Sequence, residues 1–216
     1  MEEKILEILD RANFPFYDEK AKGLIIENTL IFLKELQKWS SRISLISKTD
    51  QSHILERHFA ESLEYLKGLK GTTRLVDIGS GAGFPGIPIK ICFPDLKILL
   101  VESQRKRAGF LESVLRKMSL KNYEVAFGRA EEISLKKEYK QSFDTATFRS
   151  VTSLEKCLII GAPFLKNKGK ALLKKEINLD LSSAFSIFSG MFCTGCTQLL
   201  YLQARPQVRA RAQHAW

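Results

Sequence analysis

The sequence lacks any apolar run that approaches the length of a membrane-spanning helix. Such a helix needs about 18 to 20 consecutive apolar residues, and the 216-residue chain has none although 44% of it is hydrophobic. It also lacks an early apolar segment, because the acidic opening Met1-Glu2-Glu3 is not followed by the core of a signal peptide. We therefore expect a cytoplasmic protein with no membrane partner.

Cysteine and histidine are scarce, with 4 and 3 residues respectively. In a cytoplasmic protein we expect the thiols to be reduced. Cys193 and Cys196 have the spacing of half a zinc site, but a structural zinc site needs four ligands and His214 is the one further candidate nearby. The sequence therefore predicts no metal. We also expect His58, a lone histidine before the sheet, to be a packing residue.

Acidic residues are too few to balance the basic ones. The chain has 24 Asp and Glu against 34 Lys and Arg, which gives a formal net charge of +10. Such an excess favours polyanionic partners, with nucleic acid before an anionic membrane surface, and says nothing about the fold.

The order of predicted elements indicates an α/β fold with a helical segment in front. Residues 1 to about 70 are predicted to be a helical cap, and residues 71–216 the main domain. Within the cap, apolar residues from Leu55 to Leu66 follow the spacing of one helix face. From Arg74 onward strands and helices alternate, as in a parallel sheet with crossover helices. The predicted strands are 74–78, 97–101, 123–127, 143–148 and a fifth beginning at Ala171, after a turn at Gly169.

A glycine-rich stretch follows the first predicted strand. Asp77 lies near the carboxyl end of that strand, and Gly79, Gly81 and Gly83 alternate behind it. Glycine lets the backbone take positive φ and approach a ligand closely. A dinucleotide fingerprint places its third glycine at the sixth position, where this chain has Phe84. The pattern instead resembles motif I of the class I methyltransferases, which use S-adenosylmethionine.

Further candidates for ligand binding follow the next three strands. Glu102 closes the second strand about 25 residues after Asp77, and an acidic residue at this place binds ribose hydroxyls in Rossmann-like folds. Ala130 and Glu131 follow the third strand, where a small residue and an acid fit an adenine ring. Arg149 follows the fourth strand, where methyl donor and acceptor are expected to meet.

Longer motifs resemble one family. The stretches VDIGSGAGFPGIPIKI, VESQRKRAGFLESV, GRAEEI and FDTATFRSVTSL are similar to the bacterial glucose-inhibited division protein B family, the small-subunit ribosomal RNA (guanine-N7) methyltransferases, and ERHFAESL resembles its helix before the sheet. The resemblance implies a Rossmann-like class I fold, S-adenosylmethionine as cofactor, methyl transfer to guanine N7 of 16S ribosomal RNA, and 16S RNA or the small ribosomal subunit as partner. We expect the protein to be a monomer. Carried over by position, the cofactor contacts are Gly79, Phe84, Ala130, Glu131 and Arg149, with Arg149 also the catalytic candidate; Asp77, Gly81 and Glu102 are added from the residues themselves.

Two features leave alternatives open. The segment from about residue 189 is atypical for the family, with Arg205, Arg209 and Arg211 and no acidic residue. The motifs alone also allow a methyltransferase that acts on another substrate, or a basic RNA-binding protein with a vestigial cofactor pocket. Salt-insensitive activity would favour the first of these, and failure to bind S-adenosylmethionine would favour the second.

Overall fold

A sheet with five parallel strands forms the centre of the molecule. Two further antiparallel strands extend it beyond β5, so the order is β3-β2-β1-β4-β5-β7-β6. The predicted α/β architecture is therefore confirmed. Strand order reverses between β1 and β4, and open α/β sheets bind ligands at such a switch point, outside the carboxyl ends of the strands. The strands are β1 (Arg74–Ile78), β2 (Lys97–Glu102), β3 (Tyr123–Phe127), β4 (Phe143–Arg149), β5 (Leu165–Lys174), β6 (Phe188–Cys193) and β7 (Leu199–Ala204).

This computed structural model describes residues 1–15, 18–47, 49–149, 153–174, 188–193 and 199–204. Cys196 and His214, which bear on the zinc prediction, lie outside these residues. So does most of the atypical C-terminal segment, apart from the strands β6 and β7. Among the described residues, no helix combines the length and apolarity needed to span a membrane.

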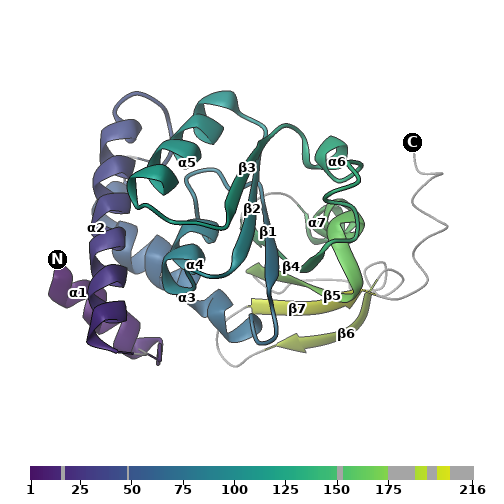
Figure 1. Ribbon diagram of the computed structural model, residues 1–216, viewed down its shortest axis with the longest axis horizontal. Helices are drawn as coiled ribbons and strands as arrows, with labels where there is room; N and C mark the ends of the chain where they lie inside the picture. The colour runs from purple at the N-terminus through teal and green to yellow at the C-terminus, as the bar shows by residue number, and fades with distance from the viewer. Residues whose placement is uncertain (16–17, 48, 150–152, 175–187, 194–198, 205–216) are drawn as a thin grey trace.

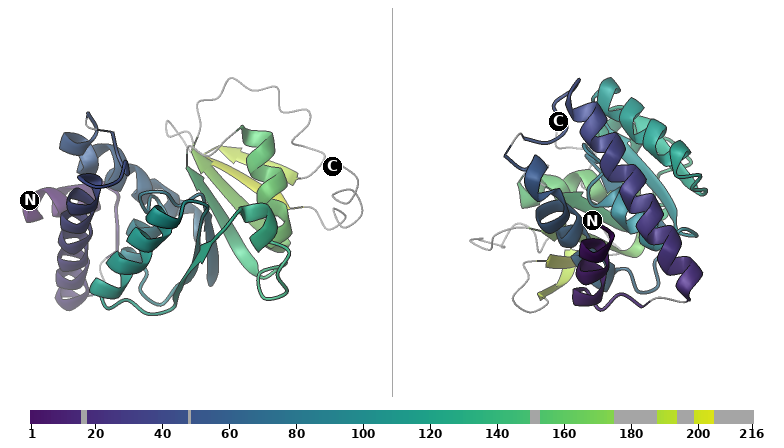
Figure 2. Two further views of the ribbon diagram at one scale, coloured as in Figure 1. Left: turned by 90° about the horizontal axis from the view of Figure 1, so that it is seen from above. Right: turned by 90° about the vertical axis from the view of Figure 1, so that its left-hand side faces the viewer.

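Helices cover both faces of the sheet, so its central strands are buried on both sides. On one face, Leu75, Ile98 and Leu100 share a hydrophobic core with the helices α1 to α5. On the other face, residues that alternate with these, such as Val76 and Leu99, pack against α6 and α7. Figures 1 and 2 show the two helical layers on opposite sides of the strands. The helices are α1 (Glu2–Arg11), α2 (Glu19–Ser40), α3 (Ala60–Glu64), α4 (Gly86–Cys92), α5 (Arg105–Lys117), α6 (Ala130–Ile133) and α7 (Leu154–Gly161).

The segment before the sheet differs from the single amphipathic helix that its apolar spacing predicts. It consists of a 3-10 turn η1 (Gln51–His53), a π-helix η2 (Ile54–Phe59), the short α3 and a second 3-10 turn η3 (Tyr65–Gly68). The apolar residues Leu55, Phe59 and Leu63 are buried as the pattern predicts. The domain boundary near residue 70 stays a prediction.

Strand β5 begins earlier than the sequence predicts. It runs from Leu165, and the predicted turn at Gly169 lies inside it. The pairing with β4 shifts register between Phe143 and Thr145, and Lys168 has a φ of 64°. A local irregularity of this kind lets a strand continue past a residue that otherwise signals a turn.

Candidate active site

The loop after β1 has the backbone conformation that its glycines allow. Gly79, Gly81 and Gly83 have φ values of 74°, 55° and 90°, which side chains other than glycine's rarely permit. The amides of Gly79 and Ser80 both donate to the carbonyl of Val101, at 2.9 and 3.1 Å. The loop is therefore fastened to the carboxyl end of β2, where Glu102 lies.

Glu102 closes against this loop. Its Oε2 accepts a hydrogen bond of 2.8 Å from the amide of Gly81, and its Oε1 accepts one of 2.8 Å from the amide of Gln104. The side chain is buried, with 4% of the residue exposed. Each carboxylate oxygen has a further lone pair, so the group can still accept hydrogen bonds from a diol placed over the loop. The structure thus brings together Gly79, Gly81 and Glu102 as the sequence predicts.

Asp77 lies beneath the loop and is 1% exposed. Its Oδ1 accepts a hydrogen bond of 2.8 Å from the hydroxyl of Thr147, its register partner on β4. Its Oδ2 is buried without a hydrogen-bond partner among the described residues. Burial raises the pKa of Asp77 to about 6, and the bond from Thr147 opposes that shift. The charged form is therefore held in the site at a cost in stability.

We expect Asp77→Asn to stabilise the protein without ligand. Because the folded-state pKa lies above the unfolded one, the native state binds the proton more tightly, so this carboxyl lowers stability above pH 6 and the penalty fades as the pH falls toward 4. A shift of about two units corresponds to at most about 3 kcal/mol. Urea unfolding at pH 7.5 should show a higher midpoint for the variant, with a smaller difference at pH 5. A lower midpoint at pH 7.5 would contradict this.

The turn after β3 lies beside Glu102. The amide of Gly128 donates to the Glu102 carbonyl at 3.0 Å, and α6 begins two residues later with Ala130 and Glu131. Ala130 is half-buried and Glu131 is exposed. Both predicted adenine contacts are therefore at the same edge of the sheet as the glycine loop.

Phe84 and Arg149 are in contact at the same edge of the sheet. The Phe84 ring is 6% exposed and packs against Phe32 and His58, with ring centroids 5.1 and 5.3 Å away. The Arg149 guanidinium lies over the same ring, 5.5 Å from its centroid. This is within the range of a cation–π contact. The loop and the end of β4 are thus joined through one aromatic side chain.

Arg149 is also held by residues of the N-terminal segment. Its Nη2 contacts Nδ1 of His58 and donates to Oε2 of Glu61 at 3.0 Å. Burial, and then the charge of Arg149, lower the pKa of His58. His58, Glu61 and Thr147 were not among the predicted site residues. The motif ERHFAESL contains the first two, whereas Thr147 meets Asp77 through the pairing of β1 with β4, for which the sequence of one strand gives no signal.

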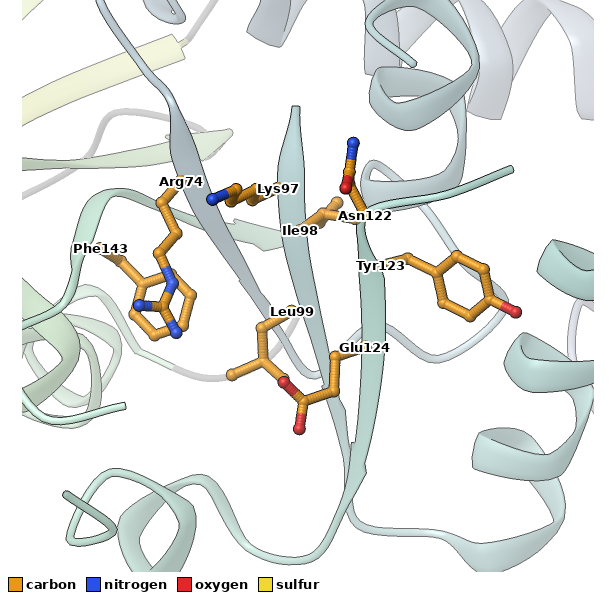
Figure 3. Close-up of a pocket in the computed structure, with 8 residues that line it drawn as sticks. All are labelled: Arg74, Lys97, Ile98, Leu99, Asn122, Tyr123, Glu124 and Phe143. Carbon is orange, nitrogen blue, oxygen red and sulfur yellow. The ribbon is translucent and has the colours of Figure 1, made fainter. Parts of the chain in front are cut away.

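A separate hollow lies at the other edge of the sheet. It is lined at the amino ends of the strands, and Figure 3 shows Arg74, Lys97, Tyr123 and Phe143 around it. None of the predicted cofactor residues lines it. Parallel α/β sheets bind their ligands at the carboxyl edge, so this hollow is not the candidate site.

Comparisons with known proteins agree with this fold. A methyltransferase from Geobacter sulfurreducens has the same fold, with a TM-score of 0.55, 15% identity and coverage of 81% of this chain and 87% of that one. A variant of MtNAS in complex with S-adenosylmethionine matches with a TM-score of 0.55, 13% identity and coverage of 95% and 98%. The ribosomal RNA small subunit methyltransferase G of Desulfitobacterium hafniense is 37% identical over 169 residues, which are 78% of this chain and 70% of that protein. The family GidB, described as rRNA small subunit methyltransferase G, matches residues 25–184. This chain therefore belongs to the GidB family of class I methyltransferase fold.

Proposed function

We propose that this protein transfers the methyl group of S-adenosylmethionine to N7 of a guanine in 16S ribosomal RNA. The observation that carries the proposal is the closure of Glu102 on the amide of Gly81, at the switch point of the sheet, in a chain of this family. It supports a methyl-donor site more than a vestigial pocket, because the buried carboxylate still has lone pairs to offer a ligand.

The residues at the carboxyl edge fit the cofactor. A Cβ built on Gly81 would meet one heavy atom within 4 Å, the carbonyl oxygen of Gly79 at 3.7 Å, so the loop leaves room above it. Glu102 would hold the ribose diol, and Ala130 with Glu131 would flank the adenine. Asp77, Gly79, Phe84 and Arg149 would surround the remainder. When bound, S-adenosylmethionine supplies a methyl group already activated by its sulfonium.

The acceptor atom explains why the site needs little acid–base chemistry. Guanine N7 has a free lone pair at neutral pH, so no general base is required. The residues of the chain have to align the base and exclude water, and positioning alone contributes about 7–11 kcal/mol to such reactions. RNA helices hide N7 in a deep, narrow groove, so the target guanine must lie in a loop or be splayed out. Arg149 is the residue we place closest to the reacting atoms.

A basic run at the mouth of the site supports RNA as the substrate. Arg105, Lys106 and Arg107 form the first turn of α5, three residues after Glu102. Positive charge at a helix N-terminus destabilises the helix. These basic residues therefore do not serve the stability of α5, which favours a role in binding. Arg107 is anchored by a 3.0 Å hydrogen bond to the carbonyl of Ser44, and Arg105 lies over the exposed ring of Phe127. Lys106 is exposed.

We expect Lys106→Ala to weaken RNA binding without changing cofactor binding. Loss of one phosphate contact should lower the magnitude of the salt slope of log affinity by about 0.7 to 0.9. Filter binding of 16S RNA between 50 and 200 mM KCl measures both quantities. Lys97→Ala is the matched control. Lys97 is also exposed, but it lies at the amino end of β2, away from Glu102 at the carboxyl end. Equal effects of the two variants would contradict a phosphate contact at Lys106.

The proposed substrate also bears on the place of action and the partner. Ribosomal RNA as substrate implies the cytoplasm, and naked 16S RNA or the small subunit is the partner. We propose that the protein acts on it as a monomer.

The test of the function is methyl transfer from labelled S-adenosylmethionine. We expect label on 16S RNA or small subunits and not on 23S RNA, and one N7-methylguanine when the base is mapped. Cofactor binding without RNA labelling would favour a methyltransferase with another substrate. Absence of cofactor binding would favour an RNA-binding module.

A further inference from the structure

Four charged side chains alternate in sign beside the candidate site. Arg149 contacts Glu61 at 3.0 Å, Glu61 contacts Lys174 at 3.3 Å, and Lys174 contacts Glu64 at 3.2 Å. Their side chains are between 14% and 35% exposed. Partly buried pairs are screened less by salt than surface pairs. These ion pairs therefore hold the four side chains in defined positions.

The strand register explains why a carboxylate is needed there. Arg149 and Lys174 are register partners at the carboxyl ends of β4 and β5, so two cations are placed side by side. Like charges in neighbouring positions of a sheet destabilise it. Glu61 reaches in from α3, and its two oxygens face one cation each.

The backbone before Glu61 is unusual in a way that suits this role. The π-helix η2 ends at Phe59, two residues before Glu61. π-helical turns are rare and frequently occur at functional sites. The same turn supplies His58 Nδ1 and, at 3.5 Å, the carbonyl of Arg57 to the Arg149 guanidinium. Within the part of the chain that the structure describes, all three hydrogen-bond partners of the Arg149 side chain thus come from one short stretch, residues 57–61.

The contacts leave part of the guanidinium available. Among the described residues, every hydrogen bond of Arg149 uses Nη2. Its Nε and Nη1 keep their N–H groups while the guanidinium carbon lies 5.5 Å from the centroid of the Phe84 ring. An arginine held by one nitrogen presents the other donors in a fixed direction.

We propose that Glu61 is a positioning residue for methyl transfer, which holds Arg149 over Phe84 and toward the reacting groups. The inference rests on the proposed function, because it deepens the role of Arg149 in that site. Glu61 does not touch the substrate in this account. It acts through Arg149, while it also separates that side chain from Lys174.

The test is Glu61→Gln, because this variant separates an effect on RNA binding from an effect on kcat. The variant adds one unit of positive charge at the mouth of the site, so an electrostatic role alone would strengthen RNA binding and leave kcat unchanged. A positioning role predicts that kcat falls about tenfold or more, while the KM for RNA stays the same or falls. Calorimetry should show binding of S-adenosylmethionine weakened several-fold, a smaller effect than the loss of kcat.

Two further variants make the result decisive. Glu56→Gln makes the same charge change on η2, at a carboxylate that pairs with Lys4, and should keep kcat within about twofold. Glu61→Asp keeps the charge and should recover part of the lost rate, and it serves as the test variant if Glu61→Gln unfolds below the assay temperature. An unchanged kcat in Glu61→Gln, or an equal loss in Glu56→Gln, would overturn the proposal. If the wild-type protein methylates no RNA, the proposed function fails. A several-fold loss of cofactor affinity in Glu61→Gln but not in Glu56→Gln would then still support the positioning of Arg149 by Glu61, and an unchanged affinity would overturn it.

Discussion

Glu102→Ala is expected to reduce the affinity for S-adenosylmethionine by about 100-fold or more. Hydrogen bonds to a charged acceptor contribute about 1.5–3 kcal/mol each, and the proposed ribose diol would lose two of them. The variant also leaves the amides of Gly81 and Gln104 without the acceptors they have now. The glycine loop then loses the contact that fixes it against β2. Isothermal titration calorimetry with the cofactor measures the effect.

Two companion variants separate cofactor contact from damage to the loop. Glu102→Gln keeps an oxygen that accepts a hydrogen bond, so we expect an intermediate loss of affinity. Glu112→Ala removes an exposed carboxylate from α5 and should bind the cofactor like the wild-type protein. Wild-type affinity in Glu102→Ala would remove Glu102 from the site and with it the main support for the proposed function.

Gly86→Ala is expected to lower the free energy of unfolding by about 2–3 kcal/mol, in the upper part of the range for overpacked cores. A Cβ at this position would lie 2.4 Å from Cδ2 of Leu100 and 2.6 Å from Oδ2 of Asp77. Leu100 is fully buried and Asp77 is held by Thr147, so neither has room to move. The start of α4 must shift, and the loop that leads into it shifts too. Chemical denaturation measures the first effect, and cofactor titration the second.

Gly109→Ala is the control for this change. Gly109 lies within α5, and a Cβ there meets nothing within 4 Å. Alanine is favoured over glycine inside a helix by about 0.5–1 kcal/mol, so this variant should be more stable than the wild-type protein. Opposite signs are therefore expected from the same substitution in two helices. A destabilised Gly109→Ala, or an unaffected Gly86→Ala, would contradict the packing described here.

The parts of the fold that depend on short-range pattern were predictable. Strand β3 has the bounds that its composition predicts, and β2 extends the predicted strand by one residue, to Glu102. The glycines at 79, 81 and 83 indicated positive φ, because glycine adopts this conformation more readily than other residue types. Placing an acid at the end of β2 was enough to bring it to the loop, because neighbouring parallel strands end at the same edge.

The remaining features depend on contacts between distant segments. The π-helical winding of η2 arises where Arg57, His58 and Glu61 meet Arg149, about 90 residues later in the chain. Apolar spacing does not report such a contact, so the pattern predicted a regular helix. The hydroxyl of Thr147 meets Asp77 through sheet register, and register is not encoded within a single strand. The early start of β5 likewise depends on its pairing with β4.

The most direct test is a crystal structure of this protein with S-adenosylmethionine bound. We predict that both ribose hydroxyls lie within hydrogen-bond distance of the Glu102 carboxylate and that the adenine lies beside Ala130 and Glu131. The methyl group should then face the side of the site formed by Phe84 and Arg149. An empty loop at high cofactor concentration, or a cofactor bound in the hollow at the amino ends of the strands, would contradict the account.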